Sequence, residues 1–283
     1  PTAAQGCSAA SSAALPKRRF GMPRAASSWS ATLRPRLTER PLGELVLDVE
    51  QALLDLAGLR YTGSGARASA IAMDKYRSTL IFNALGIPTP EMHFFGSLEE
   101  ANAVADQWLL PLVVKPNAQG STVGLSIVRE SSELQPAVEL AAKYDRELLI
   151  EKYITGREIT VAILGDEALP VVEIIPKSGF YDYRAKYTAG ESEYVCPAQI
   201  PGEVSAAAQD CALRAYRALG CAGYARVDFR LDDSGNLYCL ELNTLPGMTG
   251  TSLVPKAARA AGMSFSQLLQ RIVELAVAAD ERI

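Results

Sequence analysis

The sequence of 283 residues contains few of the side chains on which several kinds of enzyme depend. His93 is its single histidine and is expected to pack in a strand, so Ser-His-Asp chemistry has no evident base. The five cysteines are odd in number and lack metal-type spacing, so they predict neither a disulfide framework nor a zinc centre. A reducing compartment with buried thiols is the expectation. The chemistry must therefore come from carboxylates, lysines, arginines or a bound metal.

Long apolar runs and a large charge of one sign are also absent. No uninterrupted apolar run has the length of a membrane span. The net charge of −4 provides no sequence-wide basic field for nucleic acid. A hydrophobic content of 48% with 21% charged residues is typical of a globular protein, and the length is sufficient for two domains.

Residues 1–45 differ from the rest of the chain. They are rich in Ala, Ser, Pro and Arg, lack an initiator Met, and contain no acidic residue before Glu39. This composition is typical of an organelle transit peptide, but a disordered tail or an artefact of the fragment or reading frame fits equally. Ordered structure is expected from Leu45 onwards.

The pattern with the clearest chemistry is a predicted β-hairpin over residues 225–243. Apolar residues alternate with polar ones on both sides of a Ser-Gly turn at 234–235. With that turn, Asp228 lies opposite Glu241 and Arg226 lies opposite Asn243, and these four side chains share one face. Two carboxylates directly opposite each other destabilise a hairpin, and a divalent cation would remove the repulsion. Oxygen ligands favour Mg²⁺, whereas the alternative is an ordinary solvated face.

A second pattern surrounds Lys115. A buried strand over 110–116 ends at this lysine and is followed by a small-residue loop, 117–124, and a return strand, 125–128. Glycine and other small residues let backbone N–H groups approach an anion. The loop does not match the P-loop pattern, because it precedes a strand and not a helix.

Periodicity, caps and breakers predict the remaining elements. Helices are expected at 45–56, 66–85, 97–108, 133–144, 203–219 and 265–279, and strands at 92–95, 147–154, 158–164 and 169–175. Residues 176–199 form a long polar loop whose tyrosines and cations favour a lid. A Gly/Ser/Thr loop, 244–255, is expected beside the hairpin carboxylates.

Several short motifs occur in an order that resembles the D-alanine–D-alanine ligases of the ATP-grasp superfamily. The resemblance covers the chain from about residue 58 to its end. The motifs are Met73-Asp-Lys75, Val113-Val-Lys-Pro116 with Gln119-Gly-Ser-Thr-Val-Gly124, Ile150-Glu-Lys-Tyr153, Glu158-Ile-Thr-Val, Phe180-Tyr-Asp-Tyr-Arg-Ala-Lys-Tyr187, Ala225-Arg-Val-Asp228, Glu241-Leu-Asn-Thr-Leu-Pro-Gly-Met-Thr249 and Ser252-Leu-Val-Pro255.

The resemblance implies an α/β (α+β) fold in which two subdomains with antiparallel sheets grip ATP. It divides the chain into an atypical segment 1–45, a remnant of an N-terminal domain at 46–66, a small subdomain at 67–153 and a C-terminal subdomain at 154–283 with the lid 176–199. The glycine-rich start, the early Glu and the His-Gly of the family's N-terminal domain are not recognisable, so that domain is expected to be truncated or replaced.

The resemblance also implies ligand-binding residues. Those expected to bind ATP are Lys75 and Lys115 at the phosphates, Glu151, Lys152, Tyr153, Ile154 and Phe180 at the base, Glu158 at the ribose, and Asn243. Those expected to hold Mg²⁺ or Mn²⁺, as a pair of ions, are Asp228, Glu241 and Asn243.

The implied reaction joins two D-alanines through an acyl phosphate, for peptidoglycan precursors. Lys186 and Arg226 are expected to neutralise charge during phosphoryl transfer, and Arg226 with the backbone N–H of Gly247 to stabilise the oxyanion. Ser121 and Tyr187 are expected to join the small-residue loop to the lid. Ser252 and Leu253 are expected to bind the carboxylate of the second D-alanine. Tyr187 favours an amine over a hydroxy-acid acceptor. Two alternatives stay open: a nucleotide-binding module with little or no catalysis, and a related carboxylate–amine ligase.

The resemblance implies that the protein binds D-alanine and ATP. Binding to nucleic acid or to a membrane is not expected, and whether the chain forms a homodimer is left open. The bacterial cytoplasm is the expected location, or a plastid if residues 1–45 are a transit peptide.

Overall fold

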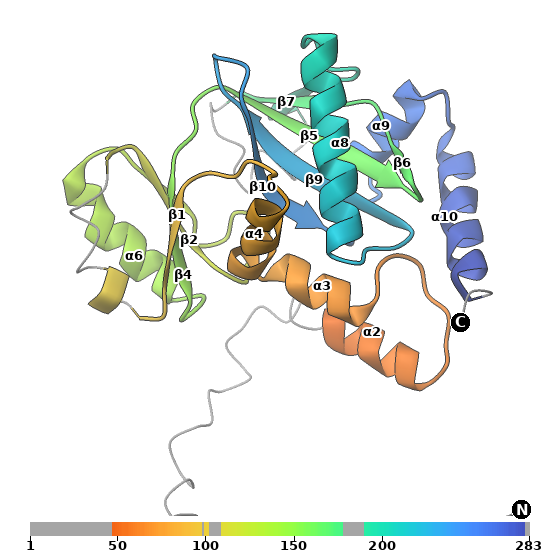
Figure 1. Cartoon of the computed structure of the whole chain (residues 1–283), viewed down its shortest axis with the longest axis horizontal. Helices are drawn as coiled ribbons and strands as arrows, with labels where there is room; N and C mark the ends of the chain where they lie inside the picture. The colour runs from red at the N-terminus through yellow and green to blue at the C-terminus, as the bar shows by residue number, and fades with distance from the viewer. Residues whose placement is uncertain (1–46, 98, 102–108, 178–189, 281–283) are drawn as a thin grey trace, which may run out of the picture. The chain divides into compact units, whose positions relative to one another are not determined.

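The computed structural model describes residues 47–97, 99–101, 109–177 and 190–280. Its helices are α2 (Leu47–Leu56), α3 (Ala66–Met73), α4 (Lys75–Ala84), α6 (Leu134–Ala142), α8 (Gly202–Ala218), α9 (Leu253–Ala260) and α10 (Phe265–Asp280), with a 3-10 turn η1 (Ser131–Glu133) (Figure 1). Its strands are β1 (Met92–Phe95), β2 (Leu112–Pro116), β3 (Ser126–Val128), β4 (Leu148–Lys152), β5 (Arg157–Leu164), β6 (Glu167–Ala168), β7 (Val172–Pro176), β8 (Ser192–Val195), β9 (Tyr224–Leu231) and β10 (Leu237–Asn243). No helix in these ranges is both long and apolar enough to cross a membrane.

The first sheet has four antiparallel strands in the order β1-β4-β2-β3. Helix α6 covers one face and buries Val138 and Ala141 against Val114 and Ile150. Because side chains alternate along a strand, the residues next to Val114 and Ile150 project from the opposite face. Lys115 on β2 and Glu151 on β4 are therefore directed away from α6.

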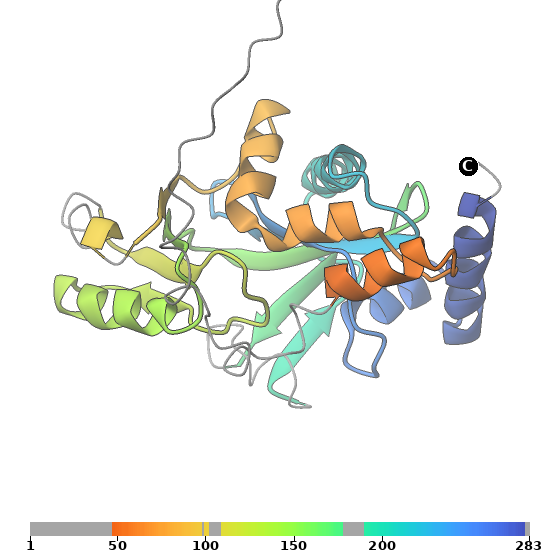
Figure 2. The same cartoon turned by 90° about the horizontal axis from the view of Figure 1, so that it is seen from below.

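The second sheet has six antiparallel strands, ordered β10-β9-β5-β7-β8 with β6 paired to β5. One face packs on α8, α3 and α4, with Ile159 and Val227 fully buried. The other face packs on α9 and α10 around Ala162 and Val172. Figure 2 shows α3 and α8 on one side of this sheet and α9 on the other. The two antiparallel sheets with their helices confirm the expected α+β class.

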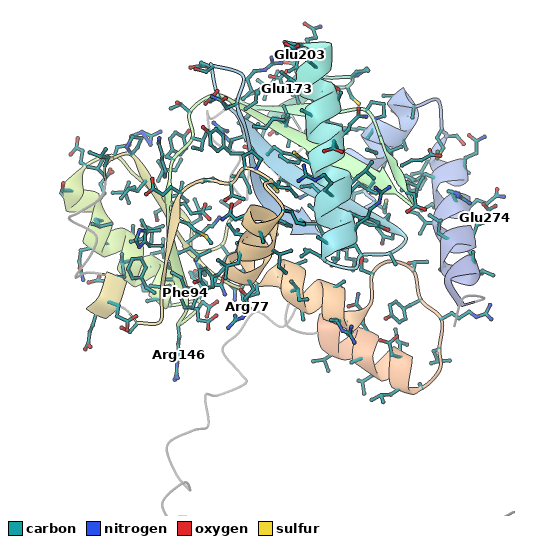
Figure 3. All side chains as sticks on the ribbon, viewed as in Figure 1. Arg77, Phe94, Arg146, Glu173, Glu203 and Glu274 are labelled. Carbon is teal, nitrogen blue, oxygen red and sulfur yellow. The ribbon has the colours of Figure 1, made fainter. Side chains whose placement is uncertain are left out.

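Helix α4 contacts both sheets. Phe82 is fully buried in the core of the six-stranded sheet. Tyr76 stacks on Phe94 of β1, with the ring centroids 4.3 Å apart. Figure 3 labels Phe94 and Arg77 beside α4. The first turn of α4, which begins with Lys75, is thereby fixed between the sheets.

The prediction of one helix over 66–85 is wrong, because the helix is interrupted at Asp74. Asp74 has φ −81° and ψ 93°, and its carboxylate accepts the backbone N–H of Arg77 as the N-cap of α4. Aspartate competes for backbone donors in this way, which makes it a better cap than a helix interior residue. The interruption starts a new helix at Lys75.

Two predicted loops contain regular structure at their ends. Residues 192–195 of the expected lid form β8, an edge strand paired to β7. The loop expected to reach Pro255 ends earlier, because α9 begins at Leu253. Pro255 occupies the first turn of α9, where a missing N–H costs no helical hydrogen bond. The strand expected at 169–175 begins at Val172, and the short β6 precedes it.

The ends of other helices follow their predicted caps. Ser97 Oγ accepts the N–H of Glu100 at 3.2 Å, as expected for the helix at 97–108, although residues 102–108 lie outside the described ranges. Ser264 and Gln267 form the reciprocal capping box predicted for α10.

The hairpin has the predicted register near the carboxylates but a different turn. Asp232 pairs with Asn236 across a three-residue turn, so the two-residue turn at 234–235 is wrong. A β-bulge between Cys239 and Glu241 then shifts the pairing by one residue. Asp228 consequently lies opposite Glu241, as predicted. Without the bulge, Glu241 would lie opposite Val227, whose side chain is in the core.

Residues 153–156, here called the connector, lead from β4 to β5 and so join the two sheets. Gly156 has φ +122°, a region that is essentially restricted to glycine. A Cβ at this position would lie 2.2 Å from the carbonyl oxygen of Leu231. The connector is therefore held directly against the backbone of β9.

Replacing Gly156 with alanine is expected to destabilise the fold by about 3 kcal/mol, since it combines a forbidden φ with a backbone collision. Urea denaturation measures the free energy of unfolding. Gly235→Ala is the matched control, because Gly235 has φ +85° with no atom within 4 Å of the added Cβ. That control is expected to lose only ~1 kcal/mol, and equal losses in the two variants would contradict the role of the close contact.

Candidate functional site

A pocket lies between the face of the four-stranded sheet opposite α6 and the β9–β10 part of the six-stranded sheet, on the face that also packs on α9 and α10. Its empty space is about 900 Å³, which includes the part open to solvent. The sequence-predicted residues that line it are Lys75, Lys115, Ser121, Glu151, Lys152, Tyr153, Ile154, Glu158, Asp228 and Glu241. The geometry thus brings together residues separated by more than half of the chain.

Lys115 and Glu151 form an ion pair on the floor of the pocket. Their Nζ and Oε1 atoms lie 2.7 Å apart, and the side chains are 8% and 7% exposed. The strands β2 and β4 are paired here, and both residues project from the face opposite α6. Removing either charge would leave the other buried without its partner, which is costly in a site so little exposed to water.

Lys75 connects the loop after β2, residues 117–124, to the hairpin. This loop is here called the glycine loop. Its Nζ donates a hydrogen bond to the carbonyl oxygen of Gln119 at 2.5 Å and lies 3.4 Å from Oε2 of Glu241. The Lys75 side chain is 8% exposed. A cation held at this junction can attract an anionic ligand that enters between the loop and the hairpin.

The loop after β2 is backbone-strained where it lines the pocket. Ser121 and Thr122 have φ of 53° and 66°, which non-glycine residues seldom adopt. Gly124 has φ +70°, and a Cβ there would lie 2.7 Å from the ring of Tyr144. Strain of this kind is concentrated at ligand clamps, because the surrounding structure must maintain it.

Asn117 fixes this loop to α4 and was not identified from the sequence. Its side-chain oxygen accepts the N–H of Tyr76 at 2.8 Å. Its amide donates to Asp74 at 3.1 Å and to Glu147 at 2.9 Å. The residue is fully buried, and no local pattern in the sequence indicates these long-range bonds.

Asp228 is surrounded by hydrogen-bond donors. Arg226 reaches both of its oxygens at 2.8 Å, and Asn243 Nδ2 donates at 3.0 Å. Thr160, on the neighbouring strand β5, donates its hydroxyl to Oδ1 at 2.6 Å. Thr160 is fully buried and was not identified from the sequence.

The predicted repulsion between Asp228 and Glu241 is offset by protein cations. Arg226 neutralises Asp228, and Lys75 lies beside Glu241. The carboxylate pair therefore does not by itself require a divalent cation. The case for a metal must come from the ligand that the pocket binds.

The oxygen donors at the hairpin nevertheless suit a hard cation. Two carboxylates, Asp228 and Glu241, are adjacent to the amide of Asn243. Mg²⁺ is usually held by one or two carboxylates together with substrate phosphates. No group of three or more His, Cys, Asp and Glu side chains in the described ranges is placed to hold a metal alone.

Burial, and then the charge of Asp228, raises the pKa of Cys239 well above its usual value, so this thiol stays neutral.

Five predicted site residues do not line the pocket. Arg226 and Asn243 both donate hydrogen bonds to Asp228, which lines the pocket. The others lie in the loop after the hairpin, where Ser252 Oγ accepts the N–H of Thr249 at 2.9 Å and would lie 3.0 Å from a Cβ at Gly247. Leu253 starts α9. Phe180, Lys186 and Tyr187 lie outside the described residues.

Arg230 lines the pocket, although it was not among the predicted site residues. It lies on β9 two residues after Asp228, so the alternation that places Arg226 and Asp228 on one face includes it. The sequence therefore contained the signal for this residue.

Comparison with known proteins relates most of the chain to one family. Residues 81–274 match the family model described as "D-ala D-ala ligase C-terminus". The D-alanine–D-alanine ligase of Nitrosospira multiformis is 49% identical over 226 residues, which are 80% of this chain and 74% of that protein. The ligase of Syntrophotalea carbinolica is 47% identical over 223 residues, 79% of this chain and 72% of its own length.

Solved structures have the same arrangement. The D-alanine–D-alanine ligase of Bacillus anthracis complexed with ATP has a TM-score of 0.73 and 38% identity, covering 85% of this chain and 78% of that one. The VanG D-Ala:D-Ser ligase from Enterococcus faecalis has a TM-score of 0.72 and 36% identity, covering 81% of this chain and 68% of the other.

The buried ion pair supports a test by double-mutant cycle. Lys115→Met is expected to cost about 3 kcal/mol of unfolding free energy, because it leaves Glu151 buried without a cation. Adding Glu151→Gln should recover most of that loss, as measured by urea denaturation. Arg271→Met, which removes an exposed pair with Glu274, should cost less than ~1 kcal/mol. Additive losses in the double variant would show that the pair is not coupled.

Proposed function

Since the chain belongs to the D-alanine–D-alanine ligase family, we propose that it joins two molecules of D-alanine into D-alanyl-D-alanine at the expense of ATP. Its antiparallel sheets form an ATP-grasp fold. The observation that carries the proposal is the pocket between them, where Lys75 and Lys115, the strained glycine loop and two carboxylates converge. The product is a precursor of peptidoglycan.

The nucleotide lies across the pocket from the connector to the glycine loop. The connector with Glu151 and Lys152 takes the base, together with Phe180, and Glu158 takes the ribose hydroxyls. The phosphates reach Lys75 and Lys115, which act as point charges on a polyanion. Support comes from one pocket that is lined by both lysines, by residues of the loop after β2, and by Tyr153, Ile154 and Glu158.

Asp228, Glu241 and Asn243 hold Mg²⁺ or Mn²⁺, as a pair of ions. Bound there, the ions would screen the negative charge of the phosphate oxygens. The side-chain oxygens of Asp228, Glu241 and Asn243 are ligands of the kind that such ions prefer.

Two bond exchanges complete the reaction. A carboxylate oxygen of the first D-alanine bonds to the γ-phosphorus as the bond to ADP breaks. The amine of the second D-alanine then bonds to the acyl carbon, which releases phosphate while the amine loses a proton. Arg226 and Lys186 neutralise charge in the first exchange, and Arg226 with the N–H of Gly247 stabilises the oxyanion of the second.

The remaining roles concern the lid and the second substrate. Ser121 and Tyr187 join the glycine loop to the lid. Ser252 and Leu253 bind the carboxylate of the second D-alanine, where the N-terminal end of α9 favours negative charge. Lys256 supports this loop by donating to Gly250 O at 3.0 Å, and burial lowers its pKa.

Three further features belong to the same proposal. The ATP-grasp subdomains comprise residues 67–153 and 154–283, after a remnant at 46–66 and an atypical segment at 1–45. Two copies of the chain form a homodimer. The bacterial cytoplasm, which supplies ATP, is the location.

One observation favours a different acceptor as a second candidate, since a solved relative is named a D-Ala:D-Ser ligase. A panel of D-alanine, D-serine and D-lactate, each offered with ATP and Mg²⁺, separates the candidates by mass spectrometry of the product. D-Alanyl-D-alanine is the expected main product. A preference for D-serine as acceptor would instead support the second candidate function.

The direct test is incubation with ATP, Mg²⁺ and D-alanine, followed by measurement of ADP and dipeptide. ADP and dipeptide in equal amounts are expected. Nucleotide binding by calorimetry without either product would instead indicate a binding module without catalysis. Removal of divalent ions with EDTA should abolish turnover, and restoring Mg²⁺ should recover it.

Glu241→Gln tests the hairpin carboxylate. The change removes one anionic ligand without altering shape, so kcat is expected to fall on the order of 100-fold, equivalent to about 2.7 kcal/mol. Stability should change little, as checked by urea denaturation. Glu167→Gln on β6, an exposed strand position, is the control and should retain full activity. Normal activity of the Glu241→Gln variant would show that Glu241 is not an essential metal ligand.

A further inference from the structure

Arg230 connects β9 to the connector between the two sheets. Its Nε donates to the carbonyl oxygen of Ile154 at 3.1 Å, and one terminal nitrogen donates to that of Gly156 at 2.8 Å. The other terminal nitrogen lies 3.5 Å from Oε2 of Glu158, its cross-strand partner on β5. One guanidinium thus contacts three nearby residues of the chain, two of which, Ile154 and Glu158, line the pocket.

The ring of Tyr153 adds a contact to the same group. The Cζ of Arg230 lies 5.7 Å from the ring centroid, and that of Arg129 lies 5.8 Å from it. Arg129 follows β3 of the four-stranded sheet, whereas Arg230 belongs to the six-stranded sheet. Cations from both sheets therefore meet at one aromatic ring of the connector, within the range of cation–π attraction.

These contacts favour a fixed connector. The guanidinium is planar and presents its donors in a rigid fork, so it can satisfy two carbonyls and a carboxylate at once. The side chains of Arg230 and Glu158 are both 15% exposed, which limits screening by water. Gly156, held against Leu231 of the same strand, restricts the connector at its other end.

We propose that Arg230 is a positioning residue for the nucleotide: it holds the connector and Glu158 in the shape that receives the base and ribose. The inference rests on the proposed function, which assigns Glu151 to Ile154 to the base and Glu158 to the ribose. It goes further because Arg230 acts through these groups and sets the affinity and sugar selectivity of the site.

A purely structural role would lower stability without changing substrate preference. A positioning role makes two different predictions. Losing Arg230 raises KM for ATP while kcat changes little, since the phosphates are bound elsewhere. It also reduces the preference for ATP over 2′-deoxy-ATP, because Glu158 is no longer held toward the ribose.

The experiment compares the unsubstituted protein with Arg230→Met, Arg230→Lys and Arg157→Met. Arg157 is the matched control, because it lies on β5 beside Glu158 and binds Glu173 through Nε at 2.6 Å, yet does not line the pocket. Figure 3 labels Glu173 beside Glu203, at the end of the molecule where α8 begins. Kinetics with ATP and 2′-deoxy-ATP are combined with calorimetry of ADP binding in the presence of Mg²⁺.

Arg230→Met is expected to raise KM for ATP and Kd for ADP about tenfold, which corresponds to ~1.4 kcal/mol. Its kcat should stay within about twofold, and its preference for ATP over 2′-deoxy-ATP should fall about fivefold, by the loss of a charge-assisted contact. Arg230→Lys should recover part of the affinity, because an ammonium cannot reproduce the fork. Arg157→Met should match the unsubstituted protein in all three measurements.

Other results would overturn the inference in distinguishable ways. Unchanged ADP affinity and sugar preference in Arg230→Met would reject the role of Arg230 while leaving the proposed function intact. If Arg230→Met does not fold, unchanged values in Arg230→Lys reject it equally. Absence of ADP binding by the unsubstituted protein would reject the proposed function, and this inference with it.

Discussion

Burial of charge between two sheets is the constraint on which the rest of this structure depends. Helices cover one face of the four-stranded sheet and parts of both faces of the six-stranded sheet. The remaining surface of each sheet presents charged side chains to the pocket, where water solvates them only in part. An unpaired ion there would cost several kcal/mol. Lys115 and Glu151 on one sheet, and Arg226 and Asp228 on the other, are accordingly paired at 2.7 Å and 2.8 Å. Lys75, on neither sheet, lies between the carbonyl oxygen of Gln119 and the carboxylate of Glu241.

The elements that cross between the sheets decide how this pocket is shaped. Helix α4 packs Phe82 on one sheet and Tyr76 on the other, while the connector passes beneath Arg230 and against Leu231. Asn117 ties the strained loop to the first turn of α4. A change in the relative position of the sheets would therefore act on the loop, the connector and Lys75 together. The shape of the pocket therefore depends on these few contacts.

Local pattern predicted most strands and helices and the hairpin register at the carboxylates, because each depends on alternation or on caps that lie nearby in sequence. It missed β6, β8 and α9. The register was correct although the turn was wrong, since the bulge before Glu241 compensated for the longer turn. The same alternation also places Arg230 on the face of Arg226 and Asp228, although Arg230 was not among the predicted site residues. Asn117 and Thr160 could not be found, because their partners lie 41 and 68 residues away along the chain. The break at Asp74 combines a local N-cap to Arg77 with a hydrogen bond from the distant Asn117.

The charges that line the pocket also bear on the requirement for metal. Among the described lining residues, four cations accompany four carboxylates: Lys75, Lys115, Lys152 and Arg230 with Glu151, Glu158, Asp228 and Glu241. A nucleotide triphosphate brings several negative charges into this balanced set, so its phosphates would meet as much repulsion as attraction. Lysines already paired with Glu151 and Glu241 offer little excess positive charge. Divalent ions beside Asp228 and Glu241 would supply the missing charge at the point where the phosphates meet the carboxylates, which is a stronger argument for Mg²⁺ than the repulsion within the hairpin.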